Sequence, residues 1–297
     1  MVLTQPKPVG ESPLALREVE EPQPAADEVR VKVTACAVCR TDIHIVEGDL
    51  ELHAAVDGTC RFCRRGRENL CPDSRYTGYD VDGGYAEYAV APQDFAYELP
   101  DGFDDEHVAP LLCGGLIGYR ALERAAVPEK GRLLLVGFGS SAHIVIQLAL
   151  HRGHEVHVVT RSENYIRRAK ELGAAWAGSD FRDLPGKADS AILFAPSGNL
   201  VPPILEALDR GGICTIAGIH LSDVPELNYS RHLYQERELR SVTSNTREDA
   251  RALFAEAKAA GIRSQTSAYP LQDANRALTD MKQSNVEGTP VLIPQFL

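Results

Sequence analysis

The feature that most constrains this chain is a glycine turn between an apolar strand and a helix. Residues 133–136 read Leu-Leu-Leu-Val, and Gly137, Phe138, Gly139, two serines and Ala142 follow them in a G-x-G-x-x-A pattern. In such a turn Gly137 permits the tight bend, Gly139 lets the backbone approach a pyrophosphate, and Ala142 lets the helix pack closely on the strand. The phosphates then lie at the helix N-terminus. The pattern predicts dinucleotide binding, and the alternative is a structural turn in an α/β domain that binds something else.

Strands and helices alternate after this turn. The pattern predicts strands at residues 133–136, 156–160, 191–194, 213–216 and 239–243, with helices at 142–152, 164–172, 201–208 and 247–260. Strands separated by helices of this length form a parallel, doubly wound sheet with helices on both faces. The fold class that we expect is therefore α/β.

The first hundred residues have a different texture. They are rich in proline, glycine and β-formers, with strands expected at 28–35 and 83–90, before a long helical pattern at 108–125. The last forty residues return to short strands around a helix near 271–283 and an extended segment at 290–294. We expect two domains: a β-rich one formed by residues 1–115 and 247–297, and a βα domain at 116–246.

Composition and charge exclude several classes of protein. Lys and Arg number 31 against 42 Asp and Glu, so the formal net charge is −11, with no long basic block to follow phosphates. The longest apolar runs fall well short of the ~18 residues that a membrane span needs, and the N-terminus lacks a secretion-signal pattern. We expect a cytoplasmic protein with neither a nucleic acid nor a membrane as its partner.

The second strand of the βα series ends in Thr160, Arg161 and Ser162. Dinucleotide-binding proteins that prefer NAD usually place an Asp or Glu there to hold the ribose 2′-hydroxyl. A guanidinium flanked by two hydroxyls suits a 2′-phosphate better, and the first carboxylate is Glu163. The sequence therefore favours NADP over NAD.

Five of the seven cysteines lie between Cys36 and Cys71. In a chain without a secretion signal, such clustering indicates metal chemistry before disulfides. Asp57, Cys60, Cys63 and Cys71 have the close spacing that lets one loop surround a tetrahedral zinc, and four protein ligands leave no open position. We expect a structural zinc site; the alternative is three free thiols on a loop rich in arginine.

Several motifs together resemble the zinc-dependent alcohol dehydrogenases of the medium-chain dehydrogenase/reductase family. The motifs are Cys39-Arg40-Thr41-Asp42-Ile43-His44, the cysteine group at 60–71, Gly-Gly-Tyr-Ala-Glu-Tyr at 83–88, Cys113 in Leu-Leu-Cys-Gly-Gly, and the glycine turn. They occur in the family's order, and the similarity runs from about residue 35 to about residue 294.

This resemblance implies a Rossmann cofactor domain and a GroES-like, barrel-like catalytic domain with the active site in the cleft between them. It assigns Cys39 and Cys113 as ligands of a catalytic zinc, Arg40 as a contact of the cofactor pyrophosphate, and Thr41 with His44 as a proton relay. The implied reaction is NAD(P)-dependent oxidation of a primary or secondary alcohol, or the reverse reduction of an aldehyde or ketone, with zinc as Lewis acid. The family also implies a homodimer or homotetramer, formed through the sheet edge near residues 239–243.

The chain departs from the family pattern in two places. Asp57 stands where the family's structural lobe begins with a Cys, and the Gly-His-Glu stretch that carries the third catalytic zinc ligand is missing. Cys39 and Cys60 are only 21 residues apart, so roughly forty residues of the pattern, with two or three strands, are absent. His53 lies in the shortened stretch, and we expect it to be a loop residue rather than a zinc ligand.

The shortening leaves two alternatives open. One is a zinc-independent NADPH reductase of quinones or enones, which needs only the cofactor and hydride geometry. The other is a non-catalytic dinucleotide-binding relative that has lost its catalytic metal site.

Overall fold

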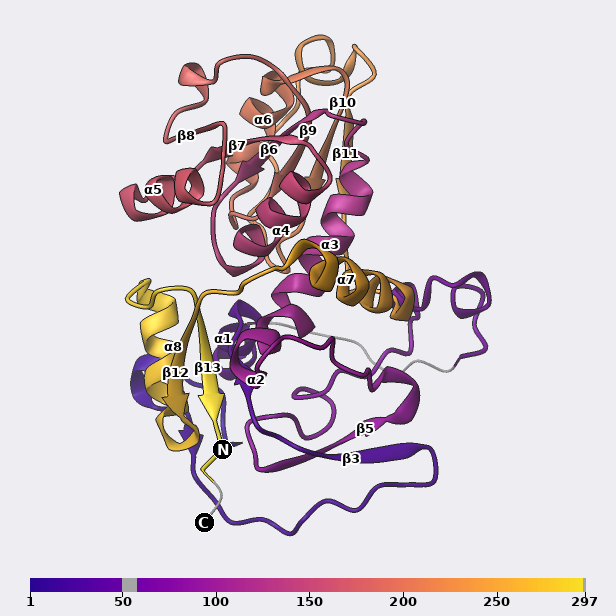
Figure 1. Cartoon of the computed structure of the whole chain (residues 1–297), viewed down its shortest axis with the longest axis vertical. Helices are drawn as coiled ribbons and strands as arrows, with labels where there is room; N and C mark the ends of the chain where they lie inside the picture. Colours follow the sequence, from indigo (N-terminus) through magenta and orange to yellow (C-terminus); the bar gives the residue numbers. More distant parts are fainter. Residues whose placement is uncertain (50–57, 296–297) are drawn as a thin grey trace. The chain divides into compact units, whose positions relative to one another are not determined.

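The computed structural model describes residues 1–49 and 58–295 and divides the chain into two compact units (Figure 1). Unit 1 comprises Met1–Cys113, Asn245–Phe254 and Ser264–Leu297, and unit 2 comprises Gly114–Ser244 and Ala255–Arg263. No helix in the described part of the chain is long and apolar enough to cross a membrane.

Unit 2 contains a six-stranded parallel sheet in the order β8-β7-β6-β9-β10-β11. Its strands are β6 (Arg132–Val136), β7 (Glu155–Val159), β8 (Trp176–Gly178), β9 (Ala188–Leu193), β10 (Leu208–Ile216) and β11 (Glu238–Ser241). The first strand lies in the middle, and later strands are added first on one side and then on the other. This doubly wound order places the topological switch point between β6 and β9, and it confirms the predicted fold class.

Helices bury both faces of this sheet. They are α3 (Gly114–Ala125), α4 (Ser140–His151), α5 (Glu163–Glu171) and α6 (Val201–Ala207). Leu134 and Val136 of β6 pack in one cluster with Ile204 of α6, while Leu133 and Leu135 point to the opposite face and are 0% exposed. Burial on both faces explains why the central strand is a continuous apolar run rather than an alternating one.

Unit 1 is built from short strands and few helices. The strands are β1 (Val2–Leu3), β2 (Leu14–Ala15), β3 (Glu28–Lys32), β4 (Cys36–Ala37), β5 (Tyr88–Pro92), β12 (Thr266–Pro270) and β13 (Thr289–Ile293), and the helices are α1 (Arg40–Glu47), α2 (Asp105–Val108) and α8 (Ala274–Gln283). β3 pairs with β5, and β13 lies between β12 and β4. The helix α7 (Arg247–Ala260) is divided between the two units.

The prediction of one continuous helix at 108–125 is wrong. After α2 the chain forms a 3-10 helix (Ala109–Leu112) and breaks at Cys113, whose φ of −129° and ψ of −79° are not helical. The N–H group of Cys113 donates only a long, 3.4 Å bond to the carbonyl of Pro110, and two glycines, which are poor helix formers, follow it. The break exposes the side chain of Cys113.

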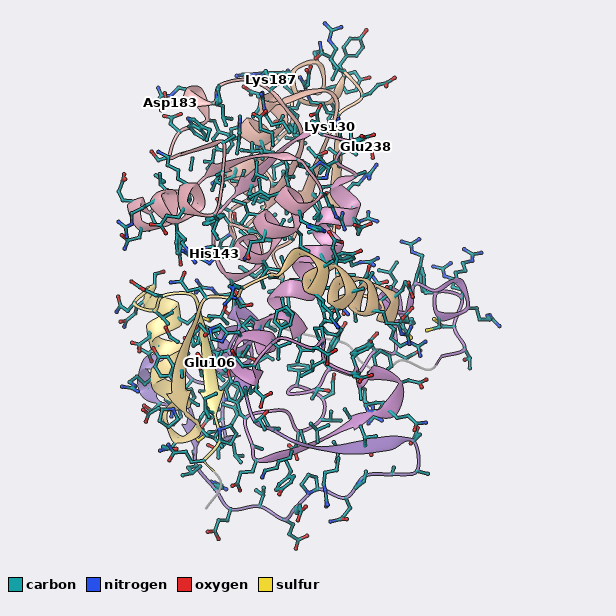
Figure 2. All side chains as sticks on the ribbon, in the orientation of Figure 1. Glu106, Lys130, His143, Asp183, Lys187 and Glu238 are labelled. Atoms are coloured by element: carbon teal, nitrogen blue, oxygen red, sulfur yellow. The ribbon has the colours of Figure 1, made fainter. Side chains whose placement is uncertain are left out.

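His143 lies in the first turn of α4 and is 5% exposed (Figure 2). Its ring packs edge-on against Phe138, with 4.6 Å between the centroids, and against Tyr165 at 5.8 Å. Its Nε2 atom has no hydrogen-bond partner in the described part of the chain. Burial, assisted by the positive charge of Arg168, lowers the pKa of His143 to about 4.

We predict that His143 makes the protein acid-sensitive. Below its ordinary pKa of 6.5 the unfolded chain takes up a proton that the folded chain refuses until about pH 4, so stability falls as the pH falls through this window. The full loss is about 3 kcal/mol. Urea unfolding at several pH values should show that H143L lacks this part of the loss, whereas H151L, at an exposed histidine, behaves like the parent. Parallel pH profiles for H143L and the parent would contradict the prediction.

Candidate active site and metal centre

Gly137 forms the tight turn at the carboxyl end of β6. Its φ is +87°, and a Cβ atom there would lie 2.8 Å from the backbone nitrogen of Ala195, which follows β9. Its N–H group donates to the carbonyl of Val159 at the end of β7. Only glycine satisfies both the positive φ and the close approach, so this residue draws the ends of three strands together at the switch point.

Gly139 serves a different purpose from Gly137. It is the N-cap of α4, its φ of −95° is open to any residue, and a Cβ atom there would meet nothing within 4 Å. The space in front of the first turn of α4 is therefore open, and Ser140, Ser141 and the buried Ala142 follow it. The first N–H groups of a helix have no carbonyl partner within the helix, so an open approach to this twelve-residue helix can accept a phosphate.

The three residues that follow β7 differ in exposure and in their hydrogen bonds. Thr160 is buried, and its N–H group donates to Gly178. Arg161 is exposed and makes no ion pair in the described part of the chain. The hydroxyl of Ser162 accepts the N–H of Tyr165 at 3.4 Å and so caps α5. Of the three residues, Arg161 is therefore the exposed one whose side chain has no ion-pair partner in the described part of the chain. The hydroxyl of Ser162 already caps α5.

Cys39 and Cys113 come together in unit 1, although 74 residues separate them. Cys39 follows β4 and is the N-cap of α1, and Cys113 lies at the break before α3. The neighbouring thiol of Cys113 and burial together raise the pKa of Cys39 well above its usual range. The structure therefore brings together the pair that the sequence assigns to one site.

Asp42 organises the start of α1 around Cys39. Its carboxylate accepts the backbone N–H of Cys39 at 2.6 Å, and burial raises its pKa. Asp42 stands within the recognised motif, but only the structure shows that it holds the backbone of Cys39.

His44 has a carboxylate partner that the sequence analysis missed. Its Nδ1 lies 3.0 Å from Oδ1 of Asp49 and donates to it, because an ionised carboxylate can only accept. Gly48 ends α1 with a φ of +74°, where a Cβ atom would lie 2.8 Å from Pro6, and this turn brings Asp49 back toward His44. The available signal was a glycine just after the helix, followed by an acid.

In the described ranges, 1–49 and 58–295, no third His, Cys, Asp or Glu joins Cys39 and Cys113 in a group that could hold a metal ion. His53 and Asp57 lie outside the described residues. Catalytic zinc sites normally have three protein ligands and one open position. The described residues therefore do not fit a complete catalytic zinc site.

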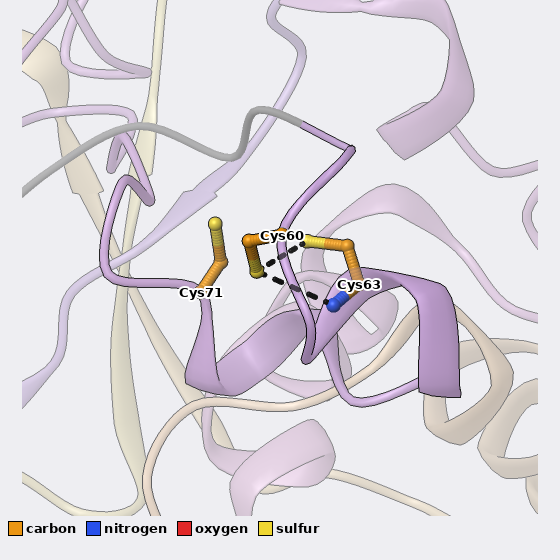
Figure 3. A group of neighbouring side chains, drawn as sticks. All are labelled: Cys60, Cys63 and Cys71. Carbon is orange, nitrogen blue, oxygen red and sulfur yellow. Dashed lines mark hydrogen bonds between the residues drawn. The ribbon is translucent and has the colours of Figure 1, made fainter.

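Cys60, Cys63 and Cys71 do form such a group, with their sulfur atoms within 4.8 Å of one another (Figure 3). The sulfurs of Cys60 and Cys63 are 3.5 Å apart, and the N–H group of Cys63 donates to the sulfur of Cys60. This backbone hydrogen bond lowers the pKa of Cys60 and favours its thiolate. Tetrahedral zinc with bonds of about 2.3 Å requires sulfurs about 3.8 Å apart, so the three thiols fit three of the four ligands of a structural zinc, and the described residues supply no fourth.

Glu68 anchors this cysteine lobe to the rest of unit 1. It is 7% exposed, and its carboxylate accepts the backbone N–H of Arg247 at 2.9 Å. The guanidinium of Arg247 also lies 3.2 Å from Asp94 and stacks over the ring of Phe95. The sequence analysis missed this contact because 179 residues separate the two partners.

We predict that the lobe binds one zinc ion per chain. Cys63→Ser and Cys71→Ser each remove one thiolate, so elemental mass spectrometry of dialysed protein should find about one zinc fewer than in the parent. Cys214→Ala is the matched control, because Cys214 is buried in β10, and it should keep the parent's zinc content. Unchanged zinc in C63S and C71S would show that the three thiols hold no metal.

Comparisons with known proteins place this geometry in a family. The sequence profile of the alcohol dehydrogenase GroES-like domain matches residues 51–101. A probable alcohol dehydrogenase, AdhA, from Mycobacterium tuberculosis (strain CDC 1551 / Oshkosh) is 48% identical over 329 residues, covering 97% of this chain and 95% of the relative. An alcohol dehydrogenase from Geobacillus stearothermophilus is 29% identical and covers 94% of this chain and 95% of its own length. The crystal structure of AibC, at 25% identity, superposes with a TM-score of 0.88 and covers 99% of this chain and 98% of its own.

The alignment with the Mycobacterium protein also bears on the shortening. It spans 329 positions, 32 more than the 297 residues of this chain, so at least that many positions face gaps in this chain. This agrees with the missing stretch inferred from the spacing of Cys39 and Cys60. Identity of 48% across nearly the whole length shows the family: the chain belongs to the alcohol dehydrogenases of the medium-chain dehydrogenase/reductase family.

Proposed function

We propose that this chain is an NAD(P)-dependent alcohol dehydrogenase, which moves a hydride between a primary or secondary alcohol and a nicotinamide dinucleotide. The observation that carries the proposal is the open approach to α4 at Gly139, next to the close-packed turn at Gly137. This pair suits a pyrophosphate at the helix N-terminus, and the family relationship supports the reaction class.

The two units take different roles in this proposal. Unit 2 corresponds to the Rossmann cofactor domain, which we place at residues 116–246, and unit 1 to the GroES-like catalytic domain at 1–115 and 247–297. Arg40, the first residue of α1, is exposed, and we propose that its guanidinium contacts the cofactor pyrophosphate.

NADP is the cofactor that we favour over NAD. The support is the exposed guanidinium of Arg161, which has no ion-pair partner in the part of the chain that the structure describes. A 2′-phosphate offers it a bidentate acceptor, whereas a 2′-hydroxyl does not. The hydroxyl of Ser162 is already bound to the N–H of Tyr165, so Arg161 contributes more of the selectivity than its neighbours.

The chain's own residues account for the proton that leaves the alcohol. Bound NAD(P)⁺ supplies the hydride acceptor, and the hydroxyl proton must leave for a carbonyl to form. Thr41 and His44 are three positions apart on α1 and therefore share one face. Because Nδ1 of His44 donates to Asp49, Nε2 is the acceptor nitrogen of the neutral ring. Thr41 passes the proton to this nitrogen, and Asp49 stabilises the imidazolium that results.

A catalytic zinc on Cys39 and Cys113 stays a prediction. The described residues provide two of the three protein ligands that such a site normally has, and we derive no step of the reaction through a metal.

The two-thiol site favours a second candidate function. A zinc-independent reductase of quinones or enones needs only a bound NADPH and a substrate held at hydride distance. Its supporting observation is the pair Cys39 and Cys113 without a third ligand in the described ranges.

We predict opposite results for the two glycines of the turn. Gly139→Ala should leave the melting temperature near that of the parent, because nothing in the protein meets the added methyl group, yet weaken NADPH binding about tenfold or more by blocking the pyrophosphate. Gly137→Ala should destabilise the fold by about 1–3 kcal/mol, because φ is +87° and Ala195 is in the way. Calorimetric titration with NADPH and NADH measures the affinities. Full-strength binding by G139A would place the dinucleotide elsewhere.

We predict that the purified chain reduces NADP⁺ with secondary alcohols. His44→Leu should lower kcat about 10²-fold through loss of the proton acceptor, and Asp49→Asn by less. His151→Leu, at an exposed residue at the end of α4, should keep the parent rate. Initial rates with a panel of alcohols, ketones and quinones give the comparison.

A chelator distinguishes the two candidate functions in the same assay. Alcohol oxidation that stops when the zinc content falls from two to one per chain supports an alcohol dehydrogenase with a catalytic metal. Ketone or quinone reduction that persists supports the zinc-independent reductase. Cofactor binding with no turnover of any substrate would contradict both.

A further inference from the structure

Two thiols of the cysteine lobe, defined here as residues 58–75, lie close enough to react with each other. The sulfur atoms of Cys60 and Cys63 are 3.5 Å apart (Figure 3), and a disulfide bond needs them at about 2.05 Å. The pair has C-x-x-C spacing, which is typical of cysteines that form and break a disulfide. Both side chains are partly exposed, whereas Cys71 is buried. A short movement of two accessible side chains therefore suffices to join them.

The backbone of the lobe favours Cys60 as the thiol that attacks first. The N–H group of Cys63 donates to the sulfur of Cys60, and a hydrogen bond to a sulfur is stronger when that sulfur is a thiolate. The thiolate is the nucleophilic form of a cysteine. Cys63 then has the position of a resolving cysteine, the second thiol that displaces a group bound to the first.

Positive charge surrounds these thiols in a chain that is otherwise acidic. The lobe holds five arginines whose side chains are all exposed: Arg61, Arg64, Arg65, Arg67 and Arg75. Glu68 is buried against Arg247, so Asp73 is the one exposed carboxylate of the lobe. The rest of the chain has 26 Lys and Arg against 40 Asp and Glu, a formal charge of −14. Figure 2 shows nitrogen-tipped side chains extending outward from the lobe.

This positive charge selects the kind of molecule that reaches the thiols. In the part of unit 1 that the structure describes, the ion pairs involve other residues, and the guanidinium of Arg61 stacks on the ring of Phe62 at 4.6 Å. Cations without a counter-charge attract anions and raise their local concentration. They also favour the thiolate form of a neighbouring cysteine. The lobe therefore suits an anionic reactant better than a neutral or a cationic one.

We propose that the lobe is a site of thiol–disulfide exchange with small anionic disulfides, for which oxidised glutathione is the probe. The thiolate of Cys60 attacks one sulfur of the probe, which forms a mixed disulfide and releases one glutathione as its thiolate. Cys63 then attacks the sulfur of Cys60 and releases the second glutathione, which takes up the proton of the Cys63 thiol. Two cysteines are thereby oxidised to one disulfide, and one molecule of oxidised glutathione is reduced to two of glutathione.

The exchange also changes what the lobe can hold. The disulfide removes two of the three thiols that lie within 4.8 Å of one another and leaves only Cys71. A structural zinc needs four ligands, so a zinc ion in the lobe is released on oxidation and can return after reduction. The thiol chemistry itself needs no metal, and the same exchange is expected of the zinc-free chain.

The test compares two disulfides that differ in charge. The reduced, full-length chain is treated at about 50 mM salt with oxidised glutathione, which is anionic, or with hydroxyethyl disulfide, which is neutral, and peptide mass spectrometry locates the products. R64E/R65E should slow oxidation of the lobe by glutathione about tenfold and by hydroxyethyl disulfide much less. R210E/R263E, at two exposed arginines of unit 2, changes the net charge equally and should react like the parent. Cys113, an exposed thiol outside the lobe, is the internal reference.

Cysteine variants test the order of attack. C63S should stop at the mixed disulfide and retain one glutathione on Cys60, because the resolving thiol is gone. C60S should lose most of the lobe's reaction, whereas C214A, at a buried cysteine of β10, should react like the parent. In the zinc-loaded parent, zinc release to a colorimetric chelator should follow disulfide formation in time.

Further measurements separate the proposal from a folding defect. Circular dichroism checks that R64E/R65E is folded, and the parent alone should react more slowly with oxidised glutathione at about 500 mM salt while its reaction with the neutral disulfide stays nearly constant. Equal slowing of both disulfides in R64E/R65E would overturn the proposal. So would a lobe that keeps its three free thiols while Cys113 is oxidised, or a C63S variant that carries glutathione only at other cysteines.

Discussion

The arrangement of unit 2 depends on one close approach of backbone to backbone. At Gly137 the chain leaves β6 so near to Ala195 that a Cβ atom would come within 2.8 Å of its nitrogen. The same residue donates its N–H group to the end of β7. The carboxyl ends of β6, β7 and β9 therefore lie close together, and the start of α4 faces the place where the winding of the sheet changes direction. Gly139 leaves that place open, so the constraint that closes the fold also shapes the site where we propose that the dinucleotide binds.

Unit 1 keeps several residues of the family's motifs although part of the family's sequence pattern is missing. Cys39 and Cys113 still meet, because Asp42 fixes the backbone of Cys39 and the helix break exposes Cys113. His44 also has a carboxylate partner, Asp49. The described residues lack a third metal ligand at this pair, whereas the lobe brings three thiols together. Among the described residues, the group suited to a metal ion is therefore the lobe and not the pair Cys39 and Cys113.

Short-range pattern predicted much of this architecture. The apolar run of β6, the glycines after it and the alternation of strands and helices follow from local sequence, so the α/β fold class is confirmed. The cysteine spacing likewise predicted the group at 60–71, and the structure brings three of its four residues together while Asp57 lies outside the described residues.

The sequence analysis missed very short elements, a break inside a helical pattern, and contacts that depend on the folded chain. β8 has three residues and too little pattern to recognise. The break at Cys113 lies within a helical pattern, and the contact of Glu68 with Arg247 spans 179 residues. Asp49 reaches His44 only because Gly48 adopts a left-handed turn against Pro6.

Hydride transfer from the nicotinamide to a carbonyl carbon can be followed with an isotope label. The chain would be incubated with NADPH carrying deuterium at nicotinamide C4 and with a panel of aldehydes and ketones, and the alcohols would be analysed by mass spectrometry. We expect one deuterium on the carbinol carbon of the product, from one face of the nicotinamide only. Unlabelled alcohol, or bound cofactor that never transfers its label, would contradict it.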